Sequence, residues 1–193
     1  MKKKIEISQL RFNYKNYKKE LLSIKNSDSN PFKQFSKWLN QAIKSNVFEP
    51  TAMSLATLRN NKVSNRIVLL KSVEKNTFIF YTNLNSQKSL SLKENPKAEM
   101  CFHWKSLLRQ VRISGHISQV SDKKADEYYN TRPYVARIGA WASKQSKVLQ
   151  SRSELINSVK KYKEKYNDEK NLPRPDYWSG WNLAPKDIEF WLY

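Results

Sequence analysis

The apolar pattern of this chain changes its period near Pro50, and that change constrains the fold more than any other feature. Upstream of it, apolar residues recur on one face of a helix that Asn30 caps and Pro31 opens. They are Phe32, Phe35, Trp38, Leu39, Ala42 and Ile43. Downstream, short runs rich in β-branched and aromatic residues alternate with polar turns, which is typical of strands. We therefore expect one helix that leads into a hairpin-rich sheet.

The region after Pro50 divides into strands and helices. Strands are expected at residues 51–58, 65–72, 77–82, 98–104 and 109–120, with a final strand at 188–193. Helices are expected at 87–94, 122–131 and 145–166, and Ser8 could cap an earlier one that ends near Leu22. Asn60-Asn61 and 74–76 supply turns between strands. This order indicates an α+β fold built on an antiparallel barrel or sheet.

Composition and motifs exclude several classes of protein. With three Gly and neither a G-x-G-x-x-G nor a Walker motif, a Rossmann fold or a P-loop ATPase is disfavoured. Cys101 is the only cysteine, so no intramolecular disulfide can form, and a cytoplasmic location is expected. The longest aliphatic run, Ile67–Leu70, is far too short to cross a membrane. His103 and His116 lack partners at ligand spacing, so no metal site is expected.

The chain is strongly basic, with 36 Lys and Arg against 17 Asp and Glu and a net charge of +19. The excess is mostly Lys and is spread along the chain, without an Arg-Gly repeat or zinc-finger spacing. Because a dispersed excess is more often a solvated surface, no nucleic-acid partner is expected, and a polyanion-binding protein is kept as a rival. The same field would attract small phosphorylated ligands.

Two segments near the first hairpins could hold phosphate. In 66–71 an aliphatic strand lies between two cations, which could serve an extended ligand or could simply reach solvent. Strict alternation puts Arg66 and Lys71 on opposite faces, so a shared site needs a bend or a partner subunit. In 80–88 a strand runs into a helix start with Lys88, where free amides and an ammonium group suit phosphate. An ordinary helix capped by Ser86 explains that pattern equally well.

Three later segments carry signals that are weak one by one. Tyr128 and Arg132 lie four residues apart on an expected helix and could converge on a phosphate or carboxylate, or form an exposed pair. Gln110 could serve the edge of a heterocycle, although a surface Gln is the default. Residues 143–146 lie at the expected start of the long helix, where free amides favour anions and an ordinary N-cap competes.

Taken in order, these segments resemble one family. They are RIVLLK at 66–71, FYTN at 80–83, a Lys after Ser-Gln at 88, RQVR at 109–112, TRP at 131–133, IGAWASKQS at 138–146 and IEFW at 188–191. The series is similar to pyridoxamine (pyridoxine) 5′-phosphate oxidase over nearly the whole chain. The resemblance implies an FMN-binding split β-barrel and a homodimer with FMN at its interface. It also implies oxidation of pyridoxamine or pyridoxine 5′-phosphate to pyridoxal 5′-phosphate, with O2 as acceptor.

The resemblance further implies which residues form the site. FMN contacts would come from Arg66, Ile67, Val68, Leu69, Leu70, Lys71, Tyr81, Thr82, Gln87, Lys88, Gln110, Gln145, Ser146 and Trp191. The substrate would contact Arg11, Tyr14, Lys71, Tyr128 and Arg132. Because the flavin supplies the redox chemistry, no catalytic acid or base is assigned. Residues 1–30 would form a helical segment over the active site, and residues 31–193 would form the FMN-binding domain.

The sequence departs from the family pattern at three places. Gln87 stands where Arg is usual, and Ala136 replaces a Ser that usually contacts the substrate phosphate. After residues 190–193 the family continues into an Arg-x-His-x-Arg segment that flanks substrate and FMN. Each lost charged hydrogen bond costs about 1.5–3 kcal/mol, so weaker binding is expected. The alternative to a working oxidase is therefore a truncated relative that binds FMN or pyridoxal phosphate without turnover, and another flavin reductase on this barrel is a further rival.

Overall fold

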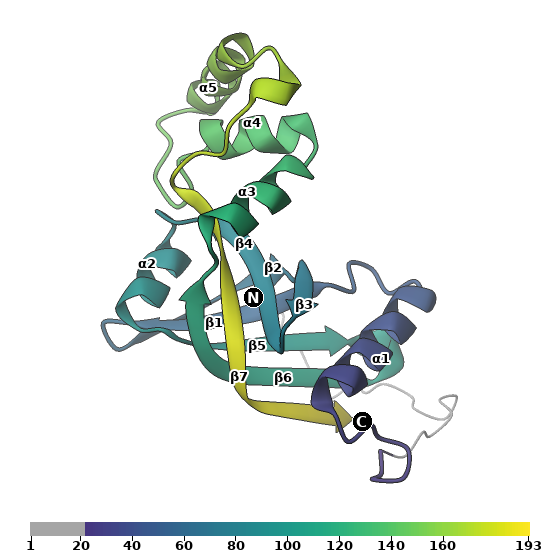
Figure 1. Ribbon diagram of the computed structural model, residues 1–193. Coiled ribbons are helices and arrows are strands. Elements are labelled where there is room, and N and C mark those ends of the chain that lie inside the picture. The colour runs from purple at the N-terminus through teal and green to yellow at the C-terminus, as the bar shows by residue number, and fades with distance from the viewer. Residues whose placement is uncertain (1–21) are drawn as a thin grey trace, which may run out of the picture.

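The computed structural model describes residues 22–193, in which seven antiparallel strands form one sheet with helices around it (Figure 1). The strands are β1 (Ala52–Arg59), β2 (Lys62–Leu69), β3 (Ser72–Glu74), β4 (Thr77–Asn83), β5 (Lys97–Trp104), β6 (Arg109–Gln119) and β7 (Trp178–Leu192). The helices are α1 (Pro31–Lys44), α2 (Gln87–Glu94), α3 (Asp122–Asn130), α4 (Tyr134–Ala142) and α5 (Arg152–Lys165), with short 3-10 turns at Lys105–Leu107 and Glu169–Asn171. Arg11, Tyr14 and nearly all of the helix expected from Ser8 lie outside the described residues.

The sheet curls on itself because its two edge strands are consecutive in the chain. The spatial order is β2-β1-β5-β6-β7-β4-β3, so β2 and β3 lie at opposite edges. Only Leu70 and Lys71 separate those strands, which forces the edges to approach each other. The backbone N–H of Leu70 donates to the Thr51 carbonyl at 2.9 Å, and that of Lys71 donates to the Ile79 carbonyl at 2.8 Å. The connection thereby contacts both sides of the opening.

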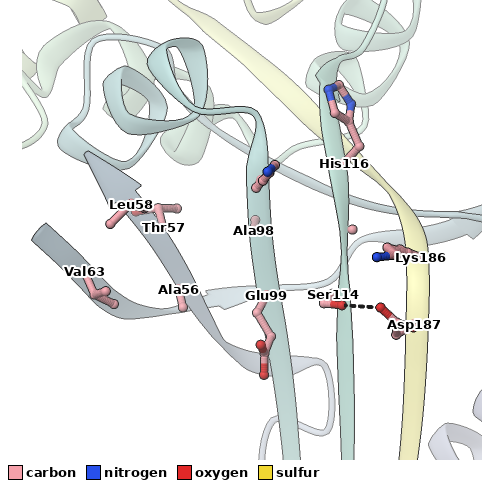
Figure 2. Close-up of a pocket in the computed structure, with 12 residues that line it drawn as sticks. Ala56, Thr57, Leu58, Val63, Ala98, Glu99, Ser114, His116, Lys186 and Asp187 are labelled. Carbon is pink, nitrogen blue, oxygen red and sulfur yellow. Dashed lines mark hydrogen bonds between the residues drawn. The ribbon is translucent and has the colours of Figure 1, made fainter. Parts of the chain in front are cut away.

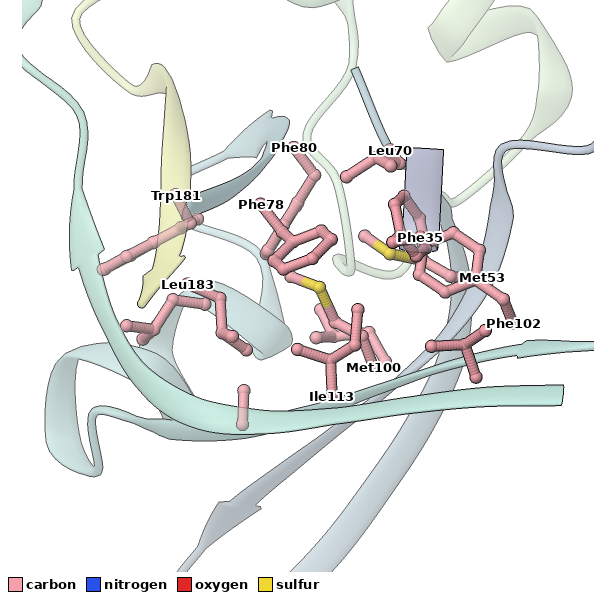
Figure 3. Packing of buried hydrophobic residues seen from close by; sticks show 14 of the residues in the cluster. Phe35, Met53, Leu70, Phe78, Phe80, Met100, Phe102, Ile113, Trp181 and Leu183 are labelled. Carbon is pink, nitrogen blue, oxygen red and sulfur yellow. The ribbon is translucent and has the colours of Figure 1, made fainter. Parts of the chain in front are cut away.

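Helix α1 closes one end of this barrel and completes its core. Its start is the expected one, since Asn30 Oδ1 accepts from the backbone N–H groups of Phe32 and Lys33 at 2.9 and 3.2 Å. The Phe35 ring lies fully buried, with centroids 5.0 Å from the rings of both Phe78 and Phe102. These rings pack with Met, Leu and Ile side chains from the inner faces of the strands (Figure 3). The expectation of an apolar helix face that packs on a sheet is confirmed.

Helices α3, α4 and α5 gather at the other end of the sheet, beside the start of β7 (Figure 1). Helix α3 ends near the expected residue, and Ser121 caps it by accepting from the Lys124 N–H at 3.3 Å. No helix among residues 22–193 is long and apolar enough to cross a membrane. The expected cytoplasmic location stays a prediction.

Three expected elements differ from the structure. The strand expected at 65–72 is two strands, because the chain leaves one sheet edge after Leu69 and enters the other at Ser72. The final strand expected at 188–193 is the end of β7, which begins at Trp178. The helix expected at 145–166 begins only at Arg152, where Ser151 Oγ accepts from the Glu154 N–H at 3.3 Å. Helix α4, apolar on most sides, was not expected at all.

Candidate functional site

A cavity of about 730 Å3 opens where strands β2, β4 and β7 meet helices α2, α3 and α4. We call it the main cavity. Ten residues expected from the sequence to contact cofactor or substrate line it: Ile67, Val68, Leu69, Lys71, Tyr81, Thr82, Lys88, Tyr128, Arg132 and Gln145. They come from segments far apart in the chain, and the curled sheet together with the helices beside β7 brings them to one place. Residues whose signals were weak one by one in the sequence therefore line one cavity in the folded chain.

One end of the main cavity surrounds the ammonium group of Lys88. This side chain is 9% exposed and lies at the start of α2. Its Nζ donates to Thr82 Oγ1 at 3.1 Å, to Ser86 Oγ at 3.3 Å and to Gln145 Oε1 at 3.1 Å. All three partners are neutral oxygens, so no carboxylate from the described part of the chain balances the buried charge. Ser86 occupies the expected N-cap position, but its hydroxyl serves Lys88 and makes no cap hydrogen bond.

The burial of this charge without a counter-ion changes the pKa of Lys88. Burial, with a smaller contribution from the nearby Arg66 cation, lowers the pKa of Lys88 from 10.5 to about 8. A buried cation without an anion is costly unless a ligand completes it. The first amides of α2 add positive potential to the same place, because the N–H groups of a helix start have no intrahelical acceptor. This end of the cavity therefore suits a phosphate group.

The loop between α4 and α5 reaches the Lys88 end of the main cavity in a strained conformation. Ser146 has a φ of 65°, in the left-handed region that side chains other than glycine seldom occupy. The conformation lets Ser146 Oγ accept from the backbone N–H of Gln87 at 3.3 Å. Strain of this kind costs about 1–3 kcal/mol and tends to occur at functional sites. Gln87 and Ser146 do not line the main cavity, but they meet each other at its rim.

The other end of the main cavity carries a second cation, Arg132. Its guanidinium Nη1 is buried and has no hydrogen-bond partner. The guanidinium carbon lies 4.7 Å from the ring centroid of Trp178, in a cation–π contact. Burial lowers the pKa of Arg132, although a guanidinium stays charged at neutral pH. The exposed-pair explanation of Tyr128 and Arg132 is wrong, because both residues line the cavity and the arginine is half buried.

Three aromatic rings stand nearly parallel next to Arg132. The rings of Tyr81 and Tyr128 stack with centroids 4.0 Å apart and an angle of 13° between their planes. Trp178 lies 5.5 Å from Tyr81 at 7°, and Gly180 leaves room for the stack, since a Cβ there would stand 2.7 Å from the Tyr81 ring. Burial raises the pKa of Tyr81 to about 12 and also raises that of Tyr128. Both phenols therefore stay neutral and can donate hydrogen bonds at ordinary pH.

Two expected FMN contacts from 66–71 point elsewhere. The Arg66 guanidinium donates to the Leu55 carbonyl at 3.0 Å and to Thr57 Oγ1 at 2.8 Å, both on β1. Leu70 is buried in the core. Lys71 has left the strand and lines the main cavity, so the bend that a shared site would require is present at 70–71. The role of Arg66 toward FMN stays a prediction.

Gln110 and Trp191 lie away from the main cavity in this chain. They are paired across β6 and β7, at the end of β7 remote from Trp178. Their strands present an outer face on which a second cavity of about 510 Å3 is found (Figure 2). Acidic and basic groups mix there, with Glu99 and Asp187 beside Lys186, and none of the expected site residues lines it. Its charge is mixed, so it does not match a phosphate site.

Sequence reasoning missed two residues at the Arg132 end of the main cavity. Trp178 lines the main cavity, and Arg174 joins α3 to the start of β7. The signal available for Arg174 was weak, since it stands between two prolines in a stretch that looked like a loop. Among residues 22–193 no group of three or more His, Cys, Asp and Glu is placed to hold a metal ion.

A family model described as pyridoxamine 5′-phosphate oxidase matches residues 39–166. The chain belongs to this family. A pyridoxine/pyridoxamine 5′-phosphate oxidase from Pelagibacter ubique is 59% identical over 163 residues, which are 84% of this chain and 78% of the relative. Another from a Cyanothece species is 45% identical over 188 residues, which are 97% of this chain and 86% of the relative. These relatives support an oxidase enzyme.

Solved structures confirm the expected split-barrel fold. PhzG from Burkholderia lata 383, solved with tetrahydrophenazine-1-carboxylic acid, has a TM-score of 0.83 and 27% identity over 90% of this chain and 86% of its own. A pyridoxamine 5′-phosphate oxidase-related, FMN-binding protein from Nostoc punctiforme has a TM-score of 0.67 and 16% identity over 84% of this chain and 85% of its own. The second likeness shows the fold alone.

Proposed function

We propose that the chain binds FMN in the main cavity and oxidises pyridoxamine or pyridoxine 5′-phosphate to pyridoxal 5′-phosphate, with O2 as electron acceptor, in vitamin B6 metabolism. One observation carries the proposal: Lys88 and Arg132 line the same cavity, and neither has an acidic partner among residues 22–193. Two uncompensated cations fit two phosphates, one on the cofactor and one on the substrate. The names of the curated relatives support this choice of substrate.

In this proposal each end of the cavity has its own task. Lys88, Thr82, Gln145 and the first amides of α2 would hold the FMN phosphate. Arg132, Tyr128 and Lys71 would hold the substrate phosphate. When bound, FMN would supply the acceptor for the hydride that leaves the C4′ carbon of the substrate. The protein would contribute mainly the orientation of the substrate against the flavin.

We also infer that two copies of the chain form a homodimer, in which Gln110 and Trp191 of one subunit complete the flavin site of the other. In a single chain these residues stand on the outer face of the sheet, away from the main cavity. Large apolar side chains are exposed on other parts of the sheet as well: Val63 by 74% and Ile67 by 66% on β2, in addition to Trp191 by 52% on β7. Such exposure is typical of an interaction surface. Light scattering coupled to gel filtration should show a mass near twice 22.9 kDa.

The function is tested by cofactor titration followed by turnover. The purified chain should bind FMN with a shifted visible spectrum and a quenched flavin fluorescence. Addition of pyridoxamine 5′-phosphate under air should then release pyridoxal 5′-phosphate and hydrogen peroxide in equal amounts. Bound FMN without peroxide would instead support the non-catalytic relative. Absence of FMN binding, together with salt-sensitive retention on nucleic acid, would favour the polyanion-binding rival.

A further inference from the structure

The Arg132 guanidinium packs over the ring of the Trp178 indole. Trp178 is 6% exposed, and its ring centroid lies 4.7 Å from the guanidinium carbon of Arg132. The edge of a second buried ring, Tyr129, faces the indole at 5.2 Å and 65°. Among the residues that the structure describes, Arg132 makes no ion pair and its Nη1 has no hydrogen-bond partner. Of the two rings in cation–π contact with its guanidinium carbon, the Trp178 indole is the nearer, at 4.7 Å against 6.0 Å for Tyr129.

A second arginine fastens the backbone of Trp178 to helix α3. Arg174 Nη1 donates to the Trp178 carbonyl at 2.7 Å. The same guanidinium donates through Nε to Asp126 at 2.6 Å and through Nη2 to Asp122 at 2.9 Å, both on α3. The side chain of Arg174 is only 9% exposed, whereas Asp122 and Asp126 are 81% and 52% exposed, so the guanidinium is buried beneath two carboxylates that face water. It connects the start of β7 to the helix that precedes Arg132.

These contacts form a closed loop. It runs from α3 through Arg174 to Trp178, from the indole face to Arg132, and from Arg132 back along the chain to α3. In a closed loop each contact limits the freedom of the others, so the guanidinium loses little further entropy when an anion binds. Without the indole, the long arginine side chain could adopt several rotamers.

We propose that Trp178 is a positioning residue for the substrate anion: it holds the Arg132 guanidinium flat, with Nη1 free for a phosphate oxygen, and Arg174 braces it. This inference rests on the proposed function for the identity of the substrate. It adds a residue to which no contact with cofactor or substrate was assigned. Trp178 acts through Arg132, so its loss should affect affinity for the phosphate more than the rate of the redox step.

The test compares Trp178→Leu with Trp178→Phe in the FMN-loaded protein. Trp178→Leu removes the flat ring and should raise the KM for pyridoxamine 5′-phosphate by roughly tenfold or more, with kcat reduced far less. The inhibition constant of inorganic phosphate should rise in parallel, which a purely structural role would not produce. Trp178→Phe keeps a ring face and should recover most of the lost affinity.

Trp38→Leu is the matched control, because Trp38 is also buried and also lies 4.8 Å from an arginine, Arg109, but remote from the main cavity. It should lower stability without a change in KM. If Trp178→Leu does not fold, Arg174→Met removes the brace and should raise KM in the same direction. Unchanged KM and phosphate inhibition in a folded Trp178→Leu, or an equal change in Trp38→Leu, would overturn the proposal.

The two proposals fail in different ways. If the wild-type chain takes up no FMN or releases no peroxide, the proposed function is contradicted. Calorimetric titration of the same variants with pyridoxal 5′-phosphate then still decides the role of Trp178, because it needs no turnover. A roughly tenfold weaker dissociation constant in Trp178→Leu, recovered in Trp178→Phe, would support the positioning role. Equal constants in all variants would refute it.

Discussion

Replacing Lys88 by Met tests the cofactor end of the main cavity. Methionine has a similar length but no charge, so the buried ammonium and its three hydrogen bonds are lost. A charge-assisted hydrogen bond to phosphate contributes about 1.5–3 kcal/mol. The attraction between unit charges 4 Å apart is about 4 kcal/mol at an effective dielectric constant near 20. We take about 3 kcal/mol as the net loss, which corresponds to roughly a hundredfold weaker FMN binding.

Flavin fluorescence quenching measures this loss directly, with Lys93→Met as the control. Lys93 lies on the same helix but is exposed, so its replacement removes the same charge without touching the cavity. The control should bind FMN within about threefold of wild type, since exposed charges contribute little. A Lys88→Met protein that binds FMN as tightly as the control would refute the assignment of Lys88 to the cofactor phosphate.

The pH dependence gives an independent check on Lys88. Its pKa in the folded protein without ligand, about 8, lies below the ordinary 10.5. Below pH 8 the buried cation therefore opposes folding, and stability recovers as pH rises from about 8 toward 10.5 because the unfolded chain binds more protons there. FMN affinity should fall over the same interval, since the ammonium loses its charge. Both trends, followed by urea unfolding and FMN titration, should be absent in Lys88→Met.

Three further replacements separate the parts of the molecule. Arg132→Ala should leave FMN binding unchanged but raise the KM for pyridoxamine 5′-phosphate by tenfold or more, as steady-state kinetics would show. Gly180→Ala places a Cβ 2.7 Å from the Tyr81 ring, so it should lower stability by about 1–3 kcal/mol and raise KM, and unaltered kinetics would argue against the Tyr81–Tyr128 stack as part of the site. Asn30→Ala removes the cap of α1 and should cost about 1 kcal/mol in urea unfolding with no effect on FMN affinity.

Elements whose signals are local agree with the sequence. Asn30 and Pro31 begin α1 where capping chemistry requires, and α2 spans the expected residues. Tyr128 and Arg132 were expected on one helix face; α3 ends at Asn130, just before Arg132, but both residues line the main cavity, and their role toward substrate stays a prediction. Such features depend on neighbours within about four residues, which a sequence displays directly.

Other features depend on partners that are distant in the chain. Leu70 and Lys71 read as the middle of a strand, but they cross between the two edges of the curled sheet. Residues 143–151 contain good helix formers, yet the loop is held near α2 through Ser146 and the N–H of Gln87. Trp178 lies between the helix expected at 145–166 and the strand expected at 188–193, and no local signal singled it out. Its partners Arg132 and Arg174 become neighbours only after α3 packs beside β7.

The sequence by itself determined the Asn30 cap of α1, most strands, the absence of a Rossmann or P-loop motif and the family. Only the tertiary structure decided which cations lack a partner, because burial and neutralisation depend on every element packed around a group. Lys88 and Arg132 read as ordinary basic residues among 36. Folding buries Lys88 and partly buries Arg132, and among residues 22–193 neither meets a carboxylate, which is why we propose these two as phosphate ligands.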